Sequence, residues 1–255
     1  MTLKNEIEFY SKVEVSANTG EIETWDRIIF PNVIRKREIE LILGQISQVK
    51  PKRILDFGCG AGWLSKILSL NGYSVVGIDV APYLIEKATR LSLDRAHFVV
   101  GDCMNLPFRE KSFDFITGVA ILHHLDIDKA LAECRRVTVD GAMSLFLEPN
   151  RLNPISALGE KIAPHTRGER RITREGLRRS LLKQGWAVRE VRCLFPYSFG
   201  LAYLLGRTGL QNSSKLGFIT KLVKVSEELL EKVPLLNQFG STLMVVAKRI
   251  NGGES

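Results

Sequence analysis

Three glycines that alternate after an apolar run are the residues with the clearest chemical meaning in this chain. Gly58, Gly60 and Gly62 follow the segment 53–57, and an amphipathic stretch at 63–70 comes next. Glycine is favoured where φ is positive or where a ligand must approach the backbone closely. A helix that begins here directs its unpaired backbone N–H groups into the same space. The pattern predicts a strand, a tight turn and a helix around a nucleotide-type cofactor site.

Two carboxylates stand at the ends of later apolar segments. Asp79 ends the segment 75–79, and Asp102 ends the segment 97–102. A carboxylate after the second strand can accept hydrogen bonds from both hydroxyls of a ribose. One after the third strand can accept a hydrogen bond from the exocyclic amine of an adenine. The two residues therefore predict that Asp79 would bind a ribose and that Asp102 would bind an adenine.

The glycine spacing differs from the dinucleotide fingerprint G-x-G-x-x-G. Trp63 occupies the position at which that fingerprint has glycine or alanine. This substitution, together with the Gly101-Asp102 pair after the third strand, disfavours a nicotinamide-dependent dehydrogenase.

The ordered set of motifs resembles the class I S-adenosylmethionine-dependent methyltransferases. The resemblance is closest to the small-molecule branch typified by the enzymes of ubiquinone and menaquinone biosynthesis, and it covers residues 33–150. A lone glycine loop would be weak evidence, whereas several motifs in the family's order and spacing are specific. The matching segments are 55–62, 76–81, 101–108, 113–116, 122–125 and 148–149.

This resemblance implies that S-adenosylmethionine is the cofactor. The glycines would cradle its methionine part, Asp79 would hold the ribose, and Asp102 would bind the adenine amine. Val80, Cys103 and Met104 would line the adenine ring. The full set expected at the cofactor is Asp56, Gly58, Cys59, Gly60, Gly62, Asp79, Val80, Asp102, Cys103, Met104 and Val119.

Apolar periodicity predicts an α/β fold in which strands and helices alternate. Strands are expected at 53–57, 74–79, 96–100, 113–118, 142–147, 187–194 and 242–248. Helices are expected at 33–49, 62–70, 82–91, 127–137 and 173–184. The resemblance implies a Rossmann-like, mainly parallel seven-stranded sheet with an antiparallel last strand and a helical insert before it. Ligands of such sheets bind at the carboxyl ends of the strands, where the glycines and carboxylates fall.

Three regions are expected along the chain. Residues 1–32 would form an N-terminal lid or helical extension, and 33–150 the Rossmann-like cofactor-binding core. Residues 151–255 would complete the same domain, with a basic insert on the substrate side at 151–172 and an apolar helical cap at 195–239.

Composition fits a protein of the reducing cytoplasm. The chain has 255 residues, of which 45% are hydrophobic, and it contains no apolar run long enough to span a membrane. The acidic-leaning N-terminus lacks the apolar core of a signal peptide. The cysteines are dispersed without a C-x-x-C pair, so a bound metal is not expected; they are Cys59, Cys103, Cys134 and Cys193.

Catalysis by such a protein requires few residues, because a sulfonium is already an activated methyl donor. The main requirement is to place the acceptor atom in line with the methyl group, and a base helps when the acceptor is a hydroxyl. His123 and His124 follow the fourth strand and are candidates for that base, with His124 expected to be the better packed. Glu148 ends the fifth strand and is a third candidate. All three residues are also consistent with a purely structural role in capping or packing their turns.

Cationic and apolar segments suggest what the acceptor is. Residues 151–192 contain eleven Lys and Arg and four Glu, so an anionic partner is favoured unless these cations only form a solvated helix face. The cap at 195–239 fits extra core, a lid for a lipid-like acceptor, or a peripheral contact with a membrane surface. We therefore expect a small-molecule or lipid-like acceptor, with an anionic one included, and no obligate protein partner is evident.

Two other functions remain open. An RNA methyltransferase would use the cationic segment, but Gly118-Val119-Ala120-Ile121 stands where enzymes that methylate base amines usually carry an Asn/Asp-Pro-Pro-aromatic motif. The basic segment also lacks interleaved aromatic residues for base stacking, so nucleic acid is disfavoured. A non-catalytic S-adenosylmethionine-binding protein would keep the glycines and Asp79 but lose turnover.

Overall fold

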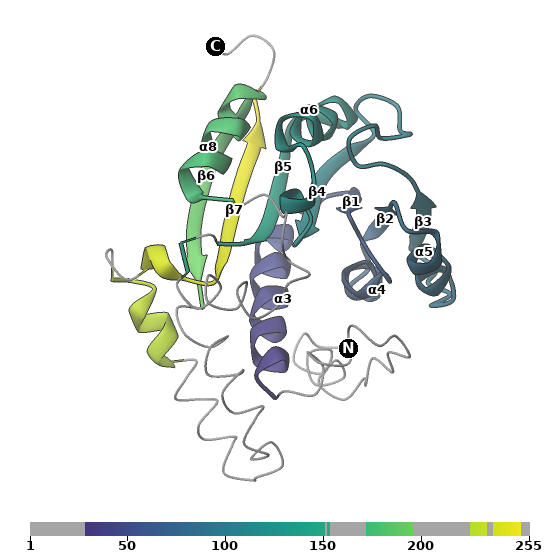
Figure 1. Cartoon of the computed structure of the whole chain (residues 1–255). Helices are drawn as coiled ribbons and strands as arrows, with labels where there is room; N and C mark the ends of the chain where they lie inside the picture. The colour runs from purple at the N-terminus through teal and green to yellow at the C-terminus, as the bar shows by residue number, and fades with distance from the viewer. Residues whose placement is uncertain (1–28, 151, 154–171, 196–224, 234–236, 251–255) are drawn as a thin grey trace.

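A computed structural model shows an α/β domain built on one seven-stranded sheet (Figure 1). It describes residues 29–150, 152–153, 172–195, 225–233 and 237–250, with side chains from residue 35 onward. The strands lie in the order β3-β2-β1-β4-β5-β7-β6. Their bounds are β1 Arg53–Phe57, β2 Ser74–Asp79, β3 Ala96–Val100, β4 Phe113–Val119, β5 Thr138–Pro149, β6 Trp186–Leu194 and β7 Thr242–Arg249.

The five strands from β3 to β5 are parallel, and β7 is antiparallel to both β5 and β6. Parallel strands need crossover connections, which here place helices over both faces of the sheet. The central strands are consequently covered on both faces, and β1 and β4 are buried along almost their whole length. The expected mainly parallel sheet with an antiparallel last strand is confirmed.

Helices cover the two faces in separate groups. α3 (Ile29–Val49) and α4 (Trp63–Leu70) pack on one face, while α6 (Ile127–Val137) and α8 (Arg174–Lys183) pack on the other. α5 (Pro82–Thr89) lies against β2 and β3. Alternate residues of each strand point to opposite faces of the sheet, and each face has its own hydrophobic core. Leu243 and Val245 of β7 face α6 and α8, while Met244 faces α3.

Two elements are longer than the periodicity predicts. α3 begins at Ile29 rather than at residue 33, and Pro31 is tolerated because it lies in the first helical turn. β5 begins at Thr138, directly after α6, rather than at residue 142, because Thr138 already pairs with Phe113 across a bulge. The remaining boundaries agree with the expected ranges to within two residues.

Much of the expected lid, insert and cap lies outside the described residues. The described parts are 29–32 of the extension, 152–153 and 172 of the basic insert, and 195, 225–233 and 237–239 of the cap. The division into these three regions stays a prediction. Among the described helices, none combines the length and the apolar character needed to cross a membrane.

Candidate functional site

The glycine loop joins β1 to α4 at the carboxyl edge of the sheet. Gly58 and Cys59 both donate their backbone N–H to the carbonyl oxygen of Ile78, at 2.9 Å each, which fastens the loop to β2. Gly62 is the N-cap of α4 with φ of 80°, in the left-handed region that favours glycine. The predicted strand, tight turn and helix are therefore present, and the loop is fixed to the neighbouring strand.

The three glycines of this loop lie in different surroundings. A methyl group on Gly58 would lie 2.4 Å from the Ile121 side chain, and one on Gly62 would lie 2.9 Å from the Phe98 ring. A methyl group on Gly60 would have no atom within 4 Å. Gly58 and Gly62 thus let other parts of the protein pack closely, whereas Gly60 borders open space in which a ligand can approach the backbone.

Asp79 ends β2 with both carboxylate oxygens oriented by the backbone. Gly60 donates its N–H to Oδ2 and Ala81 donates its N–H to Oδ1, at 2.9 Å each. A carboxylate oxygen can accept more than one hydrogen bond, so the half-buried group retains capacity for ligand hydroxyls. The bond to Gly60 places this carboxylate beside the open part of the glycine loop.

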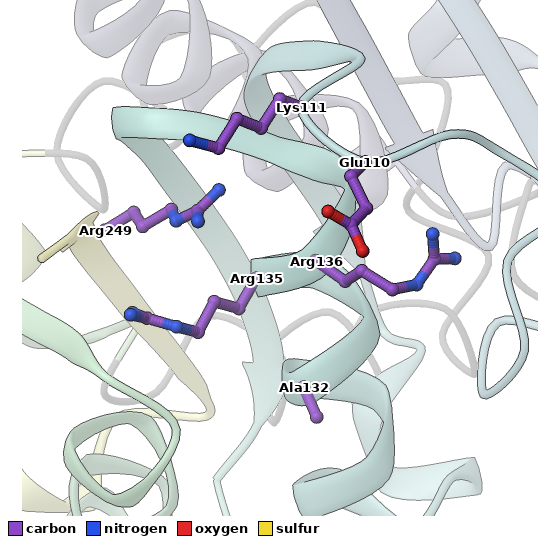
Figure 2. A pocket seen from close by; sticks show the side chains of 6 residues that line it. All are labelled: Glu110, Lys111, Ala132, Arg135, Arg136 and Arg249. Carbon is purple, nitrogen blue, oxygen red and sulfur yellow. The ribbon is translucent and has the colours of Figure 1, made fainter. Parts of the chain in front are cut away.

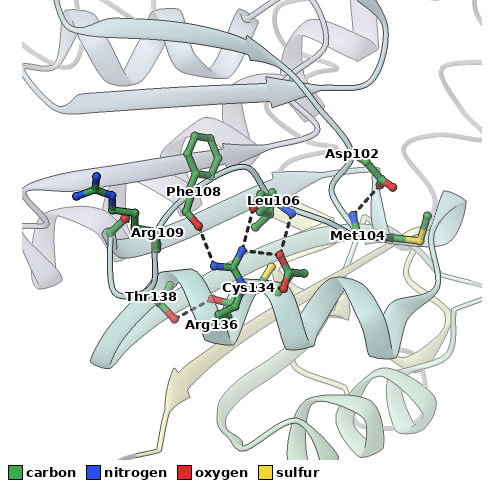
Figure 3. Close-up of polar contacts among 10 residues, drawn as sticks. Asp102, Met104, Leu106, Phe108, Arg109, Cys134, Arg136 and Thr138 are labelled. Carbon is green, nitrogen blue, oxygen red and sulfur yellow. Dashed lines mark hydrogen bonds and ion pairs between the residues drawn. The ribbon is translucent and has the colours of Figure 1, made fainter.

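Asp102 begins the turn that follows β3. Its Oδ1 accepts a hydrogen bond from the Met104 N–H at 2.7 Å (Figure 3). The Gly101 N–H donates to the carbonyl of Asp79 at 2.9 Å. Asp102 is exposed, and the bond within the turn fixes the direction of its carboxylate. The Asp79 and Asp102 turns are therefore joined at one edge of the sheet.

A partly buried ion pair on α6 holds the rest of this turn. The Leu106 N–H donates to Glu133 at 2.8 Å, and the Arg136 guanidinium donates to the carbonyls of Leu106 and Phe108 at 2.8 Å each (Figure 3). Arg136 also pairs with Glu133 at 2.7 Å. No sequence motif marks this arrangement, because its partners come from segments about 30 residues apart.

The residues expected around an adenine ring differ in exposure. Val80 is 71% exposed directly after Asp79, and Met104 is half-buried. Cys103 is buried in the core that faces α6, and burial raises the pKa of its thiol to about 12. Val80 thus offers apolar surface near Asp79, and Met104 offers it near Asp102. Cys103 instead packs in the core beneath the turn.

Asp56 and Cys59 lie beneath the loop rather than at its open side. Asp56 is 2% exposed and accepts a hydrogen bond of 2.6 Å from the Ser65 hydroxyl on α4. Burial, against the effect of this bond, raises the pKa of Asp56 to about 6. Cys59 is also buried, and burial raises the pKa of its thiol far above the ordinary range. Ser65, which no sequence signal marked, links the loop to its helix.

The turn after β4 closes over the glycine loop. Val119 ends β4 half-buried, and Ala120 follows with φ of 55°, its N–H bound to the Leu147 carbonyl at 2.7 Å. This left-handed residue directs Ile121 into the notch left by Gly58 and Gly118. A short 3-10 helix, η1 (Leu122–His124), completes the turn.

Glu148 organises this turn from the end of β5. Its Oε1 accepts hydrogen bonds from the N–H groups of Ile121, at 2.9 Å, and Leu122, at 2.8 Å. Its Oε2 lies 2.8 Å from Nδ1 of His123. The carboxylate is 1% exposed and anchors the turn after β4.

The two histidines of the turn have opposite environments. His123 is buried against Glu148, while His124 is exposed with its ring 3.9 Å from the His123 ring between centroids. The expectation that His124 is the better packed is therefore wrong. The 3-10 geometry of η1 explains the difference, since consecutive residues in such a turn point in different directions.

A shallow hollow at the opposite edge of the sheet does not belong to this site (Figure 2). It is lined by Glu110, Lys111, Ala132, Arg135, Arg136 and Arg249. Its cations already have partners: Lys111 and Arg249 pair with Asp140, and Arg135 donates to the carbonyl of Gly185. The described residues contain no cluster of His, Cys, Asp and Glu able to hold a metal ion.

A family model described as a methyltransferase domain matches residues 55–146, which run from β1 to β5. This chain carries a class I S-adenosylmethionine-dependent methyltransferase domain. The match contains the glycine loop, Asp79, Asp102 and the turn after β4. S-adenosylmethionine is the cofactor of this class of domain.

Curated relatives match somewhat less than half of the chain. A demethylmenaquinone methyltransferase of Thermotoga maritima is 37% identical over 117 residues, which are 45% of this chain and 49% of the relative. A malonyl-[acyl-carrier protein] O-methyltransferase of Serratia marcescens is 31% identical over 108 residues, 42% of either chain. The similarity thus spans about half the length of these relatives.

Solved structures share the fold over most of the chain. A geranyl diphosphate C-methyltransferase of Streptomyces coelicolor has a TM-score of 0.65 and 16% identity, covering 92% of this chain and 85% of its own. The [4+2]-cyclase SpnF has a TM-score of 0.59 and 20% identity, covering 85% of this chain and 82% of its own. At such identities the likeness shows the fold alone.

Proposed function

We propose that this protein transfers a methyl group from S-adenosylmethionine to a small-molecule acceptor. The observation that carries the proposal is the joint arrangement of Gly60 and Asp79. The backbone of Gly60 borders open space and donates to a carboxylate already held by a second amide. In a methyltransferase domain, this arrangement fits the sugar and methionine parts of the cofactor.

In this proposal, each residue at the carboxyl edge of the sheet binds a different part of the cofactor. Asp79 accepts hydrogen bonds from the ribose hydroxyls, Asp102 accepts from the adenine amine, and Val80 and Met104 contact the ring. Asp56, beneath the loop, supplies a buried carboxylate that favours a cationic ligand. When bound, S-adenosylmethionine supplies a methyl group already activated by the positive sulfur.

The turn after β4 supplies the acid–base chemistry in this proposal. His124, the exposed histidine, takes the proton of a hydroxyl acceptor as the methyl group is transferred. Glu148 and His123 act as positioning residues, because the carboxylate holds two backbone N–H groups of the turn and the His123 ring contacts His124. Replacing His124 by Ala then slows transfer to a hydroxyl and leaves cofactor affinity unchanged.

We further propose a lipid-like or anionic acceptor. The names of similar proteins point to demethylmenaquinone, a malonyl group on a carrier protein, and geranyl diphosphate. The cationic sequence at 151–192 supports an acceptor with negative charge. A role without methyl transfer is the second candidate, because a [4+2]-cyclase shares the fold and the fold by itself therefore does not require methyl transfer.

Transfer of a radiolabelled methyl group tests the proposal. Wild type, Asp79→Ala and the control Asp94→Ala, which changes an exposed acid before β3, receive labelled S-adenosylmethionine and cell extract. The extract is then divided into lipid, small-molecule, protein and nucleic-acid fractions. We expect label in the lipid or small-molecule fraction with wild type and Asp94→Ala only.

Calorimetry with S-adenosylmethionine accompanies this assay. Asp79→Ala removes charge-assisted hydrogen bonds worth about 1.5–3 kcal/mol each, so affinity falls about tenfold or more. Label in RNA would replace the proposal with an RNA methyltransferase. Cofactor binding without label in any fraction would favour a role without methyl transfer.

A further inference from the structure

The hollow at the amino ends of the parallel strands has an excess of positive charge on one side. Lys111 Nζ lies 2.7 Å from Oδ2 of Asp140, and Arg249 Nη2 lies 3.0 Å from Oδ1 of the same carboxylate. The pKa of Asp140 is lowered by the hydrogen bond from Lys111 and, to a smaller extent, by the charges of Arg249 and Arg135. We call Lys111, Arg135 and Arg249 the cation triad. Its three positive charges share one carboxylate, so two of them are left unbalanced on this side.

The other side of the hollow is not cationic. Its Arg136 pairs with Glu133 at 2.7 Å, and Glu110 adds a second acid there. Figure 2 shows the charged ends of the cation triad together, away from Glu110 and from the guanidinium of Arg136. An anion that enters the hollow is therefore attracted to the triad and repelled by Glu110.

Backbone contacts hold two members of the triad in place. Lys111 has φ of 53°, which is unfavourable for a residue with a side chain, and its N–H donates to the carbonyl of Arg136 at 3.1 Å. Arg135 Nη1 donates to the carbonyl of Gly185 at 2.5 Å. Gly185 has no side chain that would occupy the space of this guanidinium. The fold thus keeps these cations at the hollow although their charges repel one another.

The protein does not satisfy all the hydrogen-bond donors of the triad. Nε of Arg249 is buried without a hydrogen-bond partner, although both Nη atoms are bound, to Asp140 and to the carbonyl of Thr138. Among the described residues, Arg135 donates only through Nη1. A guanidinium has five N–H donors and an ammonium three. Arg135 and Lys111 therefore have donors left for an anion.

The size of the charge excess indicates which anion fits. A phosphate group carries close to two negative charges at neutral pH, whereas a carboxylate carries one. Guanidinium groups bind phosphate oxygens through parallel N–H groups, and a lysine binds them as a point charge. The hollow has a volume of about 290 Å³, which leaves room for a small substituent on the phosphate. Two unbalanced positive charges match a phosphate group better than a carboxylate.

We propose that the cation triad binds a phosphate group, either as the free ion or as part of a small ester. Arg135 and Lys111 donate hydrogen bonds to the phosphate oxygens, and Arg249 contributes its charge. The site lies at the opposite edge of the sheet from the glycine loop, so its ligand is neither the cofactor nor the methyl acceptor. The inference goes beyond the proposed methyl transfer and does not rest on it.

Phosphorus NMR tests the inference. The full chain is titrated at neutral pH and constant ionic strength with inorganic phosphate and, separately, with glycerol 3-phosphate. We expect saturable line broadening of the phosphorus signal. Tighter binding of glycerol 3-phosphate assigns the site to phosphate esters, and tighter binding of inorganic phosphate assigns it to the free ion.

Substitutions of the triad and of its acid have effects of opposite sign. Arg135→Ala is expected to weaken phosphate binding about tenfold, and Lys111→Ala, at an exposed side chain, about threefold. Asp140→Asn removes the acid that the triad shares, so it is expected to tighten binding about threefold or more. A gain of affinity cannot come from misfolding, so Asp140→Asn decides the test even if Arg135→Ala does not fold.

Lys183→Ala is the matched control for Lys111→Ala. Lys183 is an exposed lysine that pairs with one acid, Asp128, at 2.5 Å, but it lies on α8 and does not line the hollow. It is expected to bind phosphate like wild type. Wild type without saturable binding, an unchanged affinity in Asp140→Asn, or equal losses in Lys111→Ala and Lys183→Ala would overturn the inference.

Calorimetry with S-adenosylmethionine separates this inference from the proposed function. Phosphate binding by a protein that does not bind the cofactor would refute the proposed function and leave the phosphate site standing. Cofactor binding without phosphate binding would refute the phosphate site and leave the proposed function standing.

Discussion

At the scale of single residues, the three glycines of the glycine loop have different surroundings and different roles. All three adopt positive φ, at 72°, 53° and 80° for Gly58, Gly60 and Gly62. Only the two outer ones are in close contact with other side chains, those of Ile121 and Phe98. Stability and ligand binding are therefore separable within one loop.

Replacing each glycine by alanine tests this separation. Gly60→Ala is expected to cost about 1–2 kcal/mol of unfolding free energy, from the left-handed backbone alone. Gly58→Ala and Gly62→Ala add overpacking of about 1–3 kcal/mol to this cost. Urea unfolding measures the stabilities, and calorimetry measures S-adenosylmethionine affinity. A Gly60→Ala protein that keeps full affinity would contradict the ligand-facing role of Gly60.

Asp56 predicts a specific dependence of stability on pH. Burial raises its pKa from 3.8 to about 6, so between these values the folded protein holds a proton that the unfolded chain releases. The contribution of Asp56 to stability is thus greatest below pH 4 and is lost as pH rises through 6, at a cost of about 3 kcal/mol.

Asp56→Asn is expected to remove this dependence. The Asn amide oxygen can still accept the Ser65 hydroxyl, so the variant unfolds at higher urea than wild type at pH 8, and the two proteins converge at pH 4. Guanidinium or urea titrations at several pH values measure the difference. Parallel curves for the two proteins would show that Asp56 does not titrate in this range.

At the scale of elements, Glu148 connects β5 to the turn after β4. One buried carboxylate satisfies the N–H groups of Ile121 and Leu122 and contacts His123. Ile121 in turn fills the notch beside Gly58. The end of β5 thereby fixes the turn that closes over the glycine loop, although the two segments are about 25 residues apart.

Two substitutions of Glu148 are expected to behave differently. Glu148→Ala leaves buried donors without an acceptor, at about 1–3 kcal/mol each, and lowers stability by several kcal/mol. Glu148→Gln still offers an oxygen to the two N–H groups, so it unfolds close to wild type. Its amide can instead donate to His123 Nδ1, which moves the ring proton to Nε2. Nitrogen NMR of the histidine ring reports this change, and an unchanged tautomer would contradict the assigned contact.

At the scale of the whole molecule, one edge of the sheet carries the residues of the proposed cofactor site. The carboxyl ends of β1, β2, β3, β4 and β5 lie at this edge because these strands are parallel. The opposite edge carries cations that are already paired.

Cofactor binding is expected to stabilise the domain as a unit. A ligand at a hundred times its Kd adds about 2.7 kcal/mol, which raises the Tm of a chain of this size by about 5–10 °C. Scanning calorimetry with S-adenosylmethionine and S-adenosylhomocysteine measures the shift. Asp94→Ala is expected to show it in full and Asp79→Ala to lose most of it. A shift that is equal in both variants would contradict binding at Asp79.

The sequence by itself determined the α/β alternation, nearly all strand boundaries and the place of the glycines and carboxylates at one edge. These features follow from local rules, namely apolar periodicity, the conformational freedom of glycine and the carboxyl-edge geometry of parallel strands. The extra residues of β5 escaped prediction because pairing with Phe113 decides them, and local propensity does not.

The roles of the individual residues depend on the tertiary structure. The open space at Gly60, the buried positions of Asp56 and His123, and the buried ion pair of Arg37 and Glu231 depend on contacts between distant parts of the chain. Ile121 against Gly58 and Arg37 against Glu231 have no signature in local sequence, because each pair is created by packing. Burial and hydrogen-bond partners are properties of the folded chain, and they assign different roles to residues that the sequence presents alike.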